Sequence, residues 1–132
     1  MLLDDIADYL YTTVRNAGTI RKGYMPTSPD ICTGLFEYGA GSPILHFGTA
    51  GVQYEFPSLQ VRCRGEKQDY EEPRLRIEEI YRQLSGVQGM TLGSSYYLMI
   101  RPLQSPFFLQ RDEGERVIFN VNFIVEKGLS AS

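Results

Sequence analysis

The stretch VIFNVNFIVEK, residues 117–127, carries the clearest strand pattern in this 132-residue sequence. Apolar and polar side chains alternate along it, which is the period of a β-strand with one buried face. The apolar face is made of β-branched and aromatic residues: Val117, Phe119, Val121, Phe123 and Val125. Asn120 and Asn122 lie on the opposite face. The pattern predicts a strand that packs one face on a core and leaves the other face polar.

The residues before this strand predict a hairpin. RDEGER, residues 111–116, is typical of a turn, so we expect PFFLQ, residues 106–110, to pair with the final strand. Phe107, Phe108 and Leu109 are consecutive there. A strand buries only alternate side chains, so part of this apolar run needs cover from elsewhere. Either a loop over the core or a second chain supplies that cover, and both solutions stay open.

A second alternating stretch, FPSLQVRCRG at residues 56–65, predicts a strand over Ser58–Arg64. Its apolar side chains are Leu59, Val61 and Cys63, and its polar ones are Gln60, Arg62 and Arg64. Arg101 ends a further expected strand, YYLMIRPL at residues 96–103. If these strands are neighbours of the final one, a sheet face is polar with scattered positive charge. Such a face is compatible with solvation, a DNA backbone, an anion site or a subunit contact.

Two helices are expected from apolar residues at helical spacing. The first covers residues 2–15, with Asp4, Asp5 and Asp8 in its early turns, where the helix dipole favours negative charge. The second covers Tyr70–Leu84, with Asp69 as N-cap and Pro73 in the tolerated first turn. Its predicted core stripe is Leu75, Ile77, Ile80, Tyr81 and Leu84. Its charged residues, including Arg74 and Arg76, are assigned to the surface.

The order of elements predicts an α+β fold in a single domain spanning residues 1–132. Residues 31–39 are expected to form a strand, residues 21–30 a loop with two prolines, and residues 85–95 a glycine-containing connection. The order is then helix, strands, helix, strands. This order favours a mostly antiparallel sheet with two helices packed on one face.

Composition and motifs disfavour several classes of function. The net charge of −3 argues against a surface that wraps nucleic acid, although a local basic patch remains possible. Cys32 and Cys63 show no pairing or metal-ligand spacing. The only histidine, His46, has no recognisable nucleophile or orienting partner, so an enzyme is the weakest hypothesis. We expect no cofactor, no bound metal and no membrane segment, and the acidic N-terminus is unlike a signal peptide.

Several segments together resemble a known family. They are LDDIADYL, YMPTSPD, LFEYGAGSP, YEFPSLQVRCRG, YEEPRLRIEEIYRQL, RPLQSPFFLQRDE and FNVNFIVEK, in order along nearly the whole chain. This combination resembles the phage minor capsid protein family, which is related to the tail terminator (tail completion) proteins of long-tailed phages. The FPSLQVR strand leading into the helix and LQSPFFLQRDE are its most specific parts.

The resemblance implies a structural protein of the virion tail, assembled in the bacterial host cytoplasm. It implies a ring, commonly a hexamer, that caps the tail tube at its head-proximal end, stops elongation and provides the head-joining surface. Its expected partners are further copies of itself, the major tail tube protein, head-tail connector proteins and, non-specifically, passing DNA. The alternatives are a head-side connector of similar fold, or a small nucleic-acid-binding module that uses the Arg62/Arg64 strand.

The residues themselves nominate subunit-interface or lumen candidates, independently of the resemblance. The candidates share either the polar sheet face or the excess apolar strand: Gln60, Arg62, Arg64, Arg101, Phe107, Phe108, Asn120 and Asn122.

Overall fold

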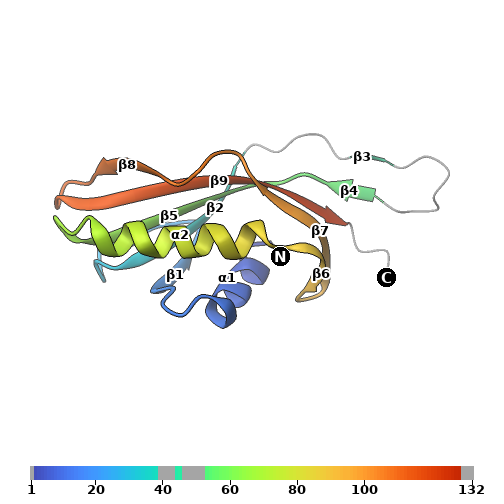
Figure 1. Cartoon of the computed structure of the whole chain (residues 1–132), viewed down its shortest axis with the longest axis horizontal. Helices are drawn as coiled ribbons and strands as arrows, with labels where there is room; N and C mark the ends of the chain where they lie inside the picture. The colour runs from blue at the N-terminus through green and yellow to red at the C-terminus, as the bar shows by residue number, and fades with distance from the viewer. Residues whose placement is uncertain (1, 39–43, 46–52, 129–132) are drawn as a thin grey trace.

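A computed structural model describes residues 2–38, 44–45 and 53–128 of the chain. Figure 1 shows a long twisted sheet with α1 and α2 on the same side of it. In chain order the described elements are α1 (Leu2–Thr13), β1 (Thr19–Lys22), β2 (Cys32–Tyr38), β3 (Ile44–Leu45), β4 (Gln53–Glu55), β5 (Ser58–Lys67), α2 (Glu71–Ser85), β6 (Gln88–Leu92), β7 (Ser95–Pro102), β8 (Phe107–Arg111) and β9 (Arg116–Gly128). The predicted α+β class and the helix-first order are confirmed.

Strand β9 is the centre of the sheet. Along one edge it pairs with β5 and then, near its C-terminal end, with β4. Along the other edge it pairs with β8 in its first half and β7 in its second half. Strand β2 continues the sheet beyond β5, and β1 beyond β2. Of the described pairings, only β1 with β2 is parallel, so the sheet is mostly antiparallel as predicted.

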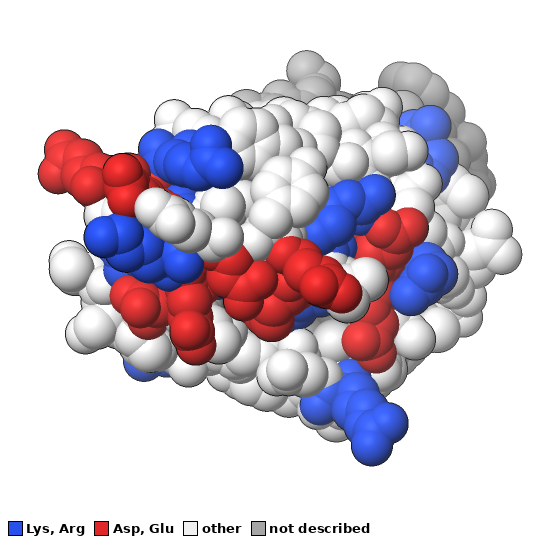
Figure 2. All heavy atoms as spheres, turned by 60° about the vertical axis from the view of Figure 1, so that its left-hand side comes forward, with Lys and Arg blue, Asp and Glu red and all other residues white. Residues whose placement is uncertain are grey.

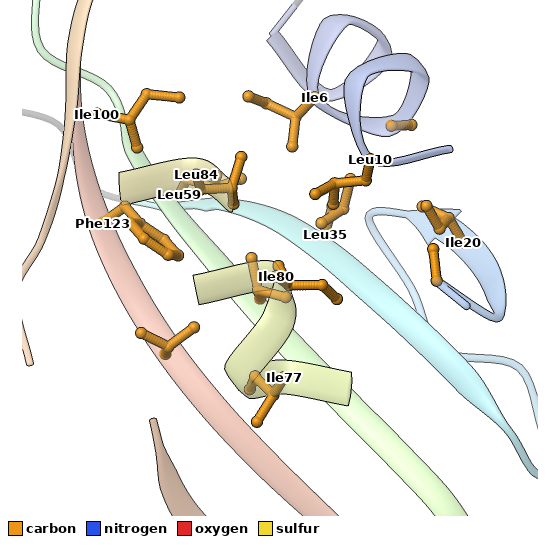
Figure 3. Packing of buried hydrophobic residues seen from close by; sticks show 14 of the residues in the cluster. Ile6, Leu10, Ile20, Leu35, Leu59, Ile77, Ile80, Leu84, Ile100 and Phe123 are labelled. Atoms are coloured by element: carbon orange, nitrogen blue, oxygen red, sulfur yellow. The ribbon is translucent and has the colours of Figure 1, made fainter. Parts of the chain in front are cut away.

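The core lies between the two helices and one face of the sheet (Figure 3). Ile6 and Leu10 of α1, Ile77 and Ile80 of α2, and Leu59 of β5 have no exposed surface. The alternating apolar residues predicted for residues 117–125 all belong to this core, as do the predicted Val61 and Cys63. Burial of these side chains is the main favourable term that holds both helices on the sheet.

Helix α2 departs from the prediction at its start and on one face. It begins at Glu71, and Tyr70, not Asp69, occupies the N-cap position, without a side-chain cap hydrogen bond. The Asp69 carboxylate still accepts a hydrogen bond from the Glu72 N–H at 3.4 Å. Leu75, predicted to be core, is 60 % exposed, while Arg76, predicted to be surface, is 3 % exposed. Ile77, Ile80 and Leu84, also predicted to be core, are fully buried, so the helix packs with the predicted face toward the sheet and Leu75 and Arg76 are the exceptions.

Four described strands, β1, β3, β4 and β6, have no counterpart among the predicted strands. Strand β1 follows the predicted first helix and ends inside the predicted loop of residues 21–30, and its four residues are strand only through pairing with β2. Strand β6 lies in the predicted connection and forms a hairpin with β7. The two-residue link Gly93-Ser94 joins them, and Gly93 has the positive φ of +62° that such hairpin turns require. A glycine-serine pair between two runs is a hairpin signal that the prediction did not use.

The buried Arg76 is satisfied by partners on several elements. Its guanidinium binds Glu72 one turn earlier, with Nε 2.9 Å from Oε2. It also donates to Thr33 Oγ1 of β2 at 2.8 Å and to the Arg64 carbonyl oxygen of β5 at 2.6 Å. Thr33 Oγ1 in turn donates to the Ala17 carbonyl at 2.7 Å. One buried arginine thus links α2, two strands and the segment that follows α1.

A second buried polar contact attaches α1 to strand β7 of the sheet. The Tyr97 hydroxyl of β7 donates to Asp5 Oδ2 of α1 at 2.6 Å, and both side chains are buried. Burial, together with this hydrogen bond, raises the pKa of Tyr97 well above its ordinary value. Asp5 was predicted as an N-terminal dipole residue, but its carboxylate also joins the helix to the sheet.

We expect replacement of Arg76 by methionine to lower the free energy of unfolding by about 3–5 kcal/mol, because it leaves a partly buried Glu72 charge without its partner. Arg74 offers a matched control, since it forms the same i,i+4 pair with Glu78 on the exposed side of the helix. Arg74→Met is expected to cost less than about 1 kcal/mol. Urea unfolding of both variants measures the difference. Equal costs would contradict the structural role given to Arg76.

Cys63 should make the free energy of unfolding depend on pH in the alkaline range. Its thiol is fully buried, and burial raises its pKa from 9.0 to about 11. The folded state therefore favours the neutral thiol. The contribution of the neutral Cys63 thiol to the free energy of unfolding is fully present below pH 9. This contribution is lost as the pH rises from 9 towards 11. We expect the stability difference between the wild-type chain and Cys63→Ala to shrink by about 2 kcal/mol over that range, measured by urea unfolding. A constant difference would refute this prediction.

Candidate assembly surfaces

The face of the sheet opposite the helices carries most of the predicted polar candidates, and the strand register brings them together. Across β5 and β9, Gln60 lies opposite Asn122 and Arg62 opposite Asn120. On the far side of β9, Phe107 lies opposite Asn120. A row of Arg62, Asn120 and Phe107 therefore crosses three strands. We call this the outer face, defined by Gln60, Arg62, Phe107, Asn120 and Asn122.

The outer face contains two buried polar atoms that have no hydrogen-bond partner among the described residues. They are Arg62 Nε and Asn120 Oδ1. Asn120 is 1 % exposed, and its Nδ2 donates to Asn122 Oδ1 at 3.2 Å. The Arg62 guanidinium lies 5.5 Å from the centre of the Phe36 ring. Buried polar groups are normally paired, and these two atoms are enclosed, so the accessible polar part of this face consists of the exposed portions of Gln60, Arg62 and Asn122.

Arg101 lies further along the same face, opposite Ile124 of β9. Its guanidinium is 3.6 Å from Glu126 Oε1, and its side chain is 53 % exposed. A pair this exposed contributes little to stability. Arg101 therefore remains accessible at the edge of the outer face.

Arg64 does not belong to the accessible part of this face, which corrects its nomination as an interface or lumen residue. It is 4 % exposed. Its Nε donates to the Asp30 carbonyl at 2.9 Å, and its Nη2 donates to the carbonyls of Pro26 and Pro29 at 2.6 and 2.8 Å. The loop of residues 23–31 folds over Arg64 and uses it as an internal donor. Burial, with the nearby Arg116 charge, lowers the pKa of the Arg64 guanidinium.

The same loop is held at two further points. Arg116 Nη1 donates to Asp30 Oδ1 at 3.1 Å and to the Thr27 carbonyl oxygen, while its Nε donates to Asp112 Oδ2, outside the loop, at 2.8 Å. Gly34 of β2 makes room for the loop, because a Cβ there would lie 2.7 Å from Met25 Cγ. This explains a glycine inside a strand. The loop thus covers one end of the outer face. Of the residues that define this face, Asn120 is buried, Gln60, Arg62 and Asn122 are partly exposed, and Phe107 is exposed.

The apolar run of β8 is left largely exposed. Strand β8 is an edge strand that pairs only with β9 among the described strands. Phe107 is 37 % exposed on the outer face, and Phe108 is 40 % exposed on the helix side. Phe108 contacts the buried Phe119, with ring centres 6.0 Å apart, and the exposed Tyr70, at 6.1 Å. Of the two sources of cover considered, no described loop encloses either phenylalanine.

The described residues contain no cluster of three or more histidine, cysteine or acidic residues that could hold a metal ion. His46, the weak candidate for catalysis, lies outside the described residues. Within the described part of the chain, no helix is long and apolar enough to cross a membrane. The candidate functional features of the described part are therefore its surfaces.

A comparison with protein families gives these surfaces a context. The model for the bacteriophage tail terminator protein family matches residues 4–127. This chain belongs to that family. The resemblance inferred from its segments is thereby confirmed, and the tail terminator is a structural protein of tail completion and a component of the virion.

A solved structure supports the fold. A chain of the "Virion of native gene transfer agent (GTA) particle" is similar with a TM-score of 0.69 and 8 % sequence identity. The match covers 97 % of this chain and 95 % of that chain. At this identity the similarity shows a shared fold. No curated protein sequence matches this chain.

We predict that Arg64→Met loosens the loop of residues 23–31 without unfolding the sheet, because three carbonyl oxygens lose their buried donor. Hydrogen exchange at the backbone amides of residues 23–31 should accelerate, while exchange in α2 and β9 stays slow. Arg62→Met is the control, since Arg62 lies two residues away on the same strand face but has no hydrogen bond to this loop. Unchanged loop exchange in Arg64→Met would show that other contacts suffice to hold it.

Proposed function

We propose that this chain terminates its tail by closing into a ring on the last ring of the tail tube. The ring stops tube elongation and presents the surface that joins the head. This role requires no catalysis. The contacts between copies must close a ring by rotation. The chain must also bind the end of a tube more strongly than a further copy of the tube protein binds it.

The outer face is the observation that carries the proposal. The helices cover one face of the sheet, and the opposite face carries the exposed Phe107 and Arg101 and the partly buried Arg62. Protein interfaces are wet and rich in aromatic side chains and arginine. A ring that caps a tube needs a surface for the tube end besides its subunit contacts, and the outer face is available for that contact.

The proposed partners follow from this position in the virion. They are further copies of the chain, most simply in a hexamer, the major tail tube protein below the ring and head-tail connector proteins above it. Contact with passing DNA would be weak and non-specific, since the chain has a net charge of −3. The ring would lie at the head-proximal end of the tail after assembly in the host cytoplasm.

A specific nucleic-acid-binding role has less support. The hypothesis used Arg62 and Arg64 together, and Arg64 is enclosed by loop carbonyls. Arg62 and Arg101 remain on the outer face, with Glu126 beside Arg101. Two arginines are few for a phosphate track, whose affinity depends on the number of phosphates neutralised.

Purified chain added to polymerising tail tube protein should shorten the tubes and leave a ring at one end, which electron microscopy of tube lengths detects. Arg62→Glu combined with Arg101→Glu should raise the concentration needed for capping at least about tenfold, which corresponds to ~1.4 kcal/mol of contact energy. Arg82→Glu combined with Arg15→Glu, which makes the same charge change at exposed positions outside this face, is the control. Tubes of unaltered length at saturating wild-type chain would refute the terminator role.

A further inference from the structure

We propose that the ring closes through two patches on opposite sides of α2, one aromatic and basic, the other acidic. The aromatic patch of one copy consists of Tyr70, Phe108 and Arg111, on the helix side of β8. It docks into the acidic groove beside α2 of the next copy, where Leu75 is the apolar centre. This contact deepens the proposed function and rests on it, since it names the surfaces that the ring would use.

The aromatic patch is rigid and already partly desolvated. Tyr70, 51 % exposed, stacks on Phe108 at 6.1 Å, and both rings contact the buried Phe119, which fixes them from below. The Arg111 guanidinium lies 5.7 Å from the centre of the Phe108 ring. Among the described residues Arg111 forms no ion pair. Tyrosine and arginine on a rigid aromatic base are the residue types that dominate binding energy at interfaces.

The acidic groove has the complementary composition. It is a depression of about 390 Å³ lined by Asn16, Asp69, Glu71, Glu72, Leu75, Arg76 and Glu79. Leu75 is 60 % exposed, and Glu71 and Glu79 lie one helical turn on either side of it. Figure 2 shows acidic side chains in a band across this face of the molecule.

The carboxylates of the groove differ in how far they are already neutralised. Glu72 is held by Arg76, and Glu79 Oε1 accepts a hydrogen bond from the Arg15 N–H at 3.2 Å. Glu71 is exposed and forms no ion pair within the described part of the chain. It is the carboxylate most available to an arginine from outside.

The two patches flank α2 and adjoin at its N-terminus. In Figure 1, α2 lies between β8 above and α1 below. The groove includes Asn16, which follows α1, whereas the aromatic patch is built on β8. Tyr70 of the patch stands between Asp69 and Glu71 of the groove. Because the two surfaces differ, a contact between the patch of one copy and the groove of another is heterologous and leaves one surface of each kind free for the next copy.

Charge complementarity selects a second copy as the occupant of the groove. Among the described residues, Arg111 is an unpaired cation at the rim of an apolar patch, and Glu71 is an unpaired carboxylate beside an exposed leucine. Nucleic acid is a poor occupant, because the groove carboxylates repel phosphate. A twofold contact between two aromatic patches would bring the two Arg111 side chains together, which like-charge repulsion disfavours.

Charge reversal with mixing tests the contact. Arg111→Glu alone places a carboxylate against Glu71, and Glu71→Arg alone places a second guanidinium against Arg111, so each variant should raise the dissociation constant of the ring at least about tenfold. A one-to-one mixture should restore rings, because the altered patch of one variant then meets the altered groove of the other. Native mass spectrometry, in solution and on tube ends, should show alternating subunits and an even-numbered ring.

Matched controls make the outcome specific. Arg82→Glu and Asp8→Arg carry the same charge changes on exposed helix positions that do not line the groove, and rings should form normally. Far-UV circular dichroism confirms folding of each variant. If a reversal variant fails to fold, Arg111→Gln and Glu71→Gln replace the pair. Each should then weaken the ring, and the double variant should weaken it little beyond either single one.

The failures of the two proposals are distinguishable. Rings that form equally well from the wild-type chain and from both single variants would overturn this contact and leave the terminator ring standing. Folded single variants that fail alone and also fail as a mixture would overturn the contact as well. A wild-type chain that forms no ring, free or on tube ends, would overturn the proposed function and this contact together.

Discussion

The hydrogen bonding of β9 is the constraint on which the other elements depend. It is the longest described strand and pairs with four others, β5 and β4 on one edge and β8 and β7 on the other. Its register decides which side chains face the helices, because a slip of one residue would exchange the valine and phenylalanine face for the asparagine face. The apolar core and the outer face are therefore two consequences of a single register.

The sequence predicts this part of the fold well, because the information is local. Alternation in residues 117–125 and 58–64 identifies β9 and β5, and helical spacing identifies both helices. The placement of Gln60, Arg62 and Asn122 on one face follows from the same alternation. Strands β1 and β6 were missed because short strands of mixed polarity are defined by their neighbours, not by their own pattern.

The buried arginines mark where local patterns cease to predict structure. Arg64 alternates correctly with its strand neighbours, yet the loop of residues 23–31 folds over it and supplies three carbonyl acceptors. No periodicity in residues 58–64 contains that information. The same limit applies to the acidic groove, because the apolar spacing of α2 assigned Leu75 to the core and so concealed the centre of the groove.

Leu75 and Arg76 lie in environments opposite to those predicted for them; hydrogen bonding accounts for the arginine and helix geometry for the leucine. Arg76 satisfies Glu72, Thr33 and the Arg64 carbonyl in one buried geometry, and an unpaired charge or acceptor at this depth would be costly. Residues two apart on a helix point about 160° apart, so Leu75 lies nearly opposite the buried Ile77 and faces solvent. The packing that buries Ile77 thereby exposes the leucine around which a neighbouring copy would pack.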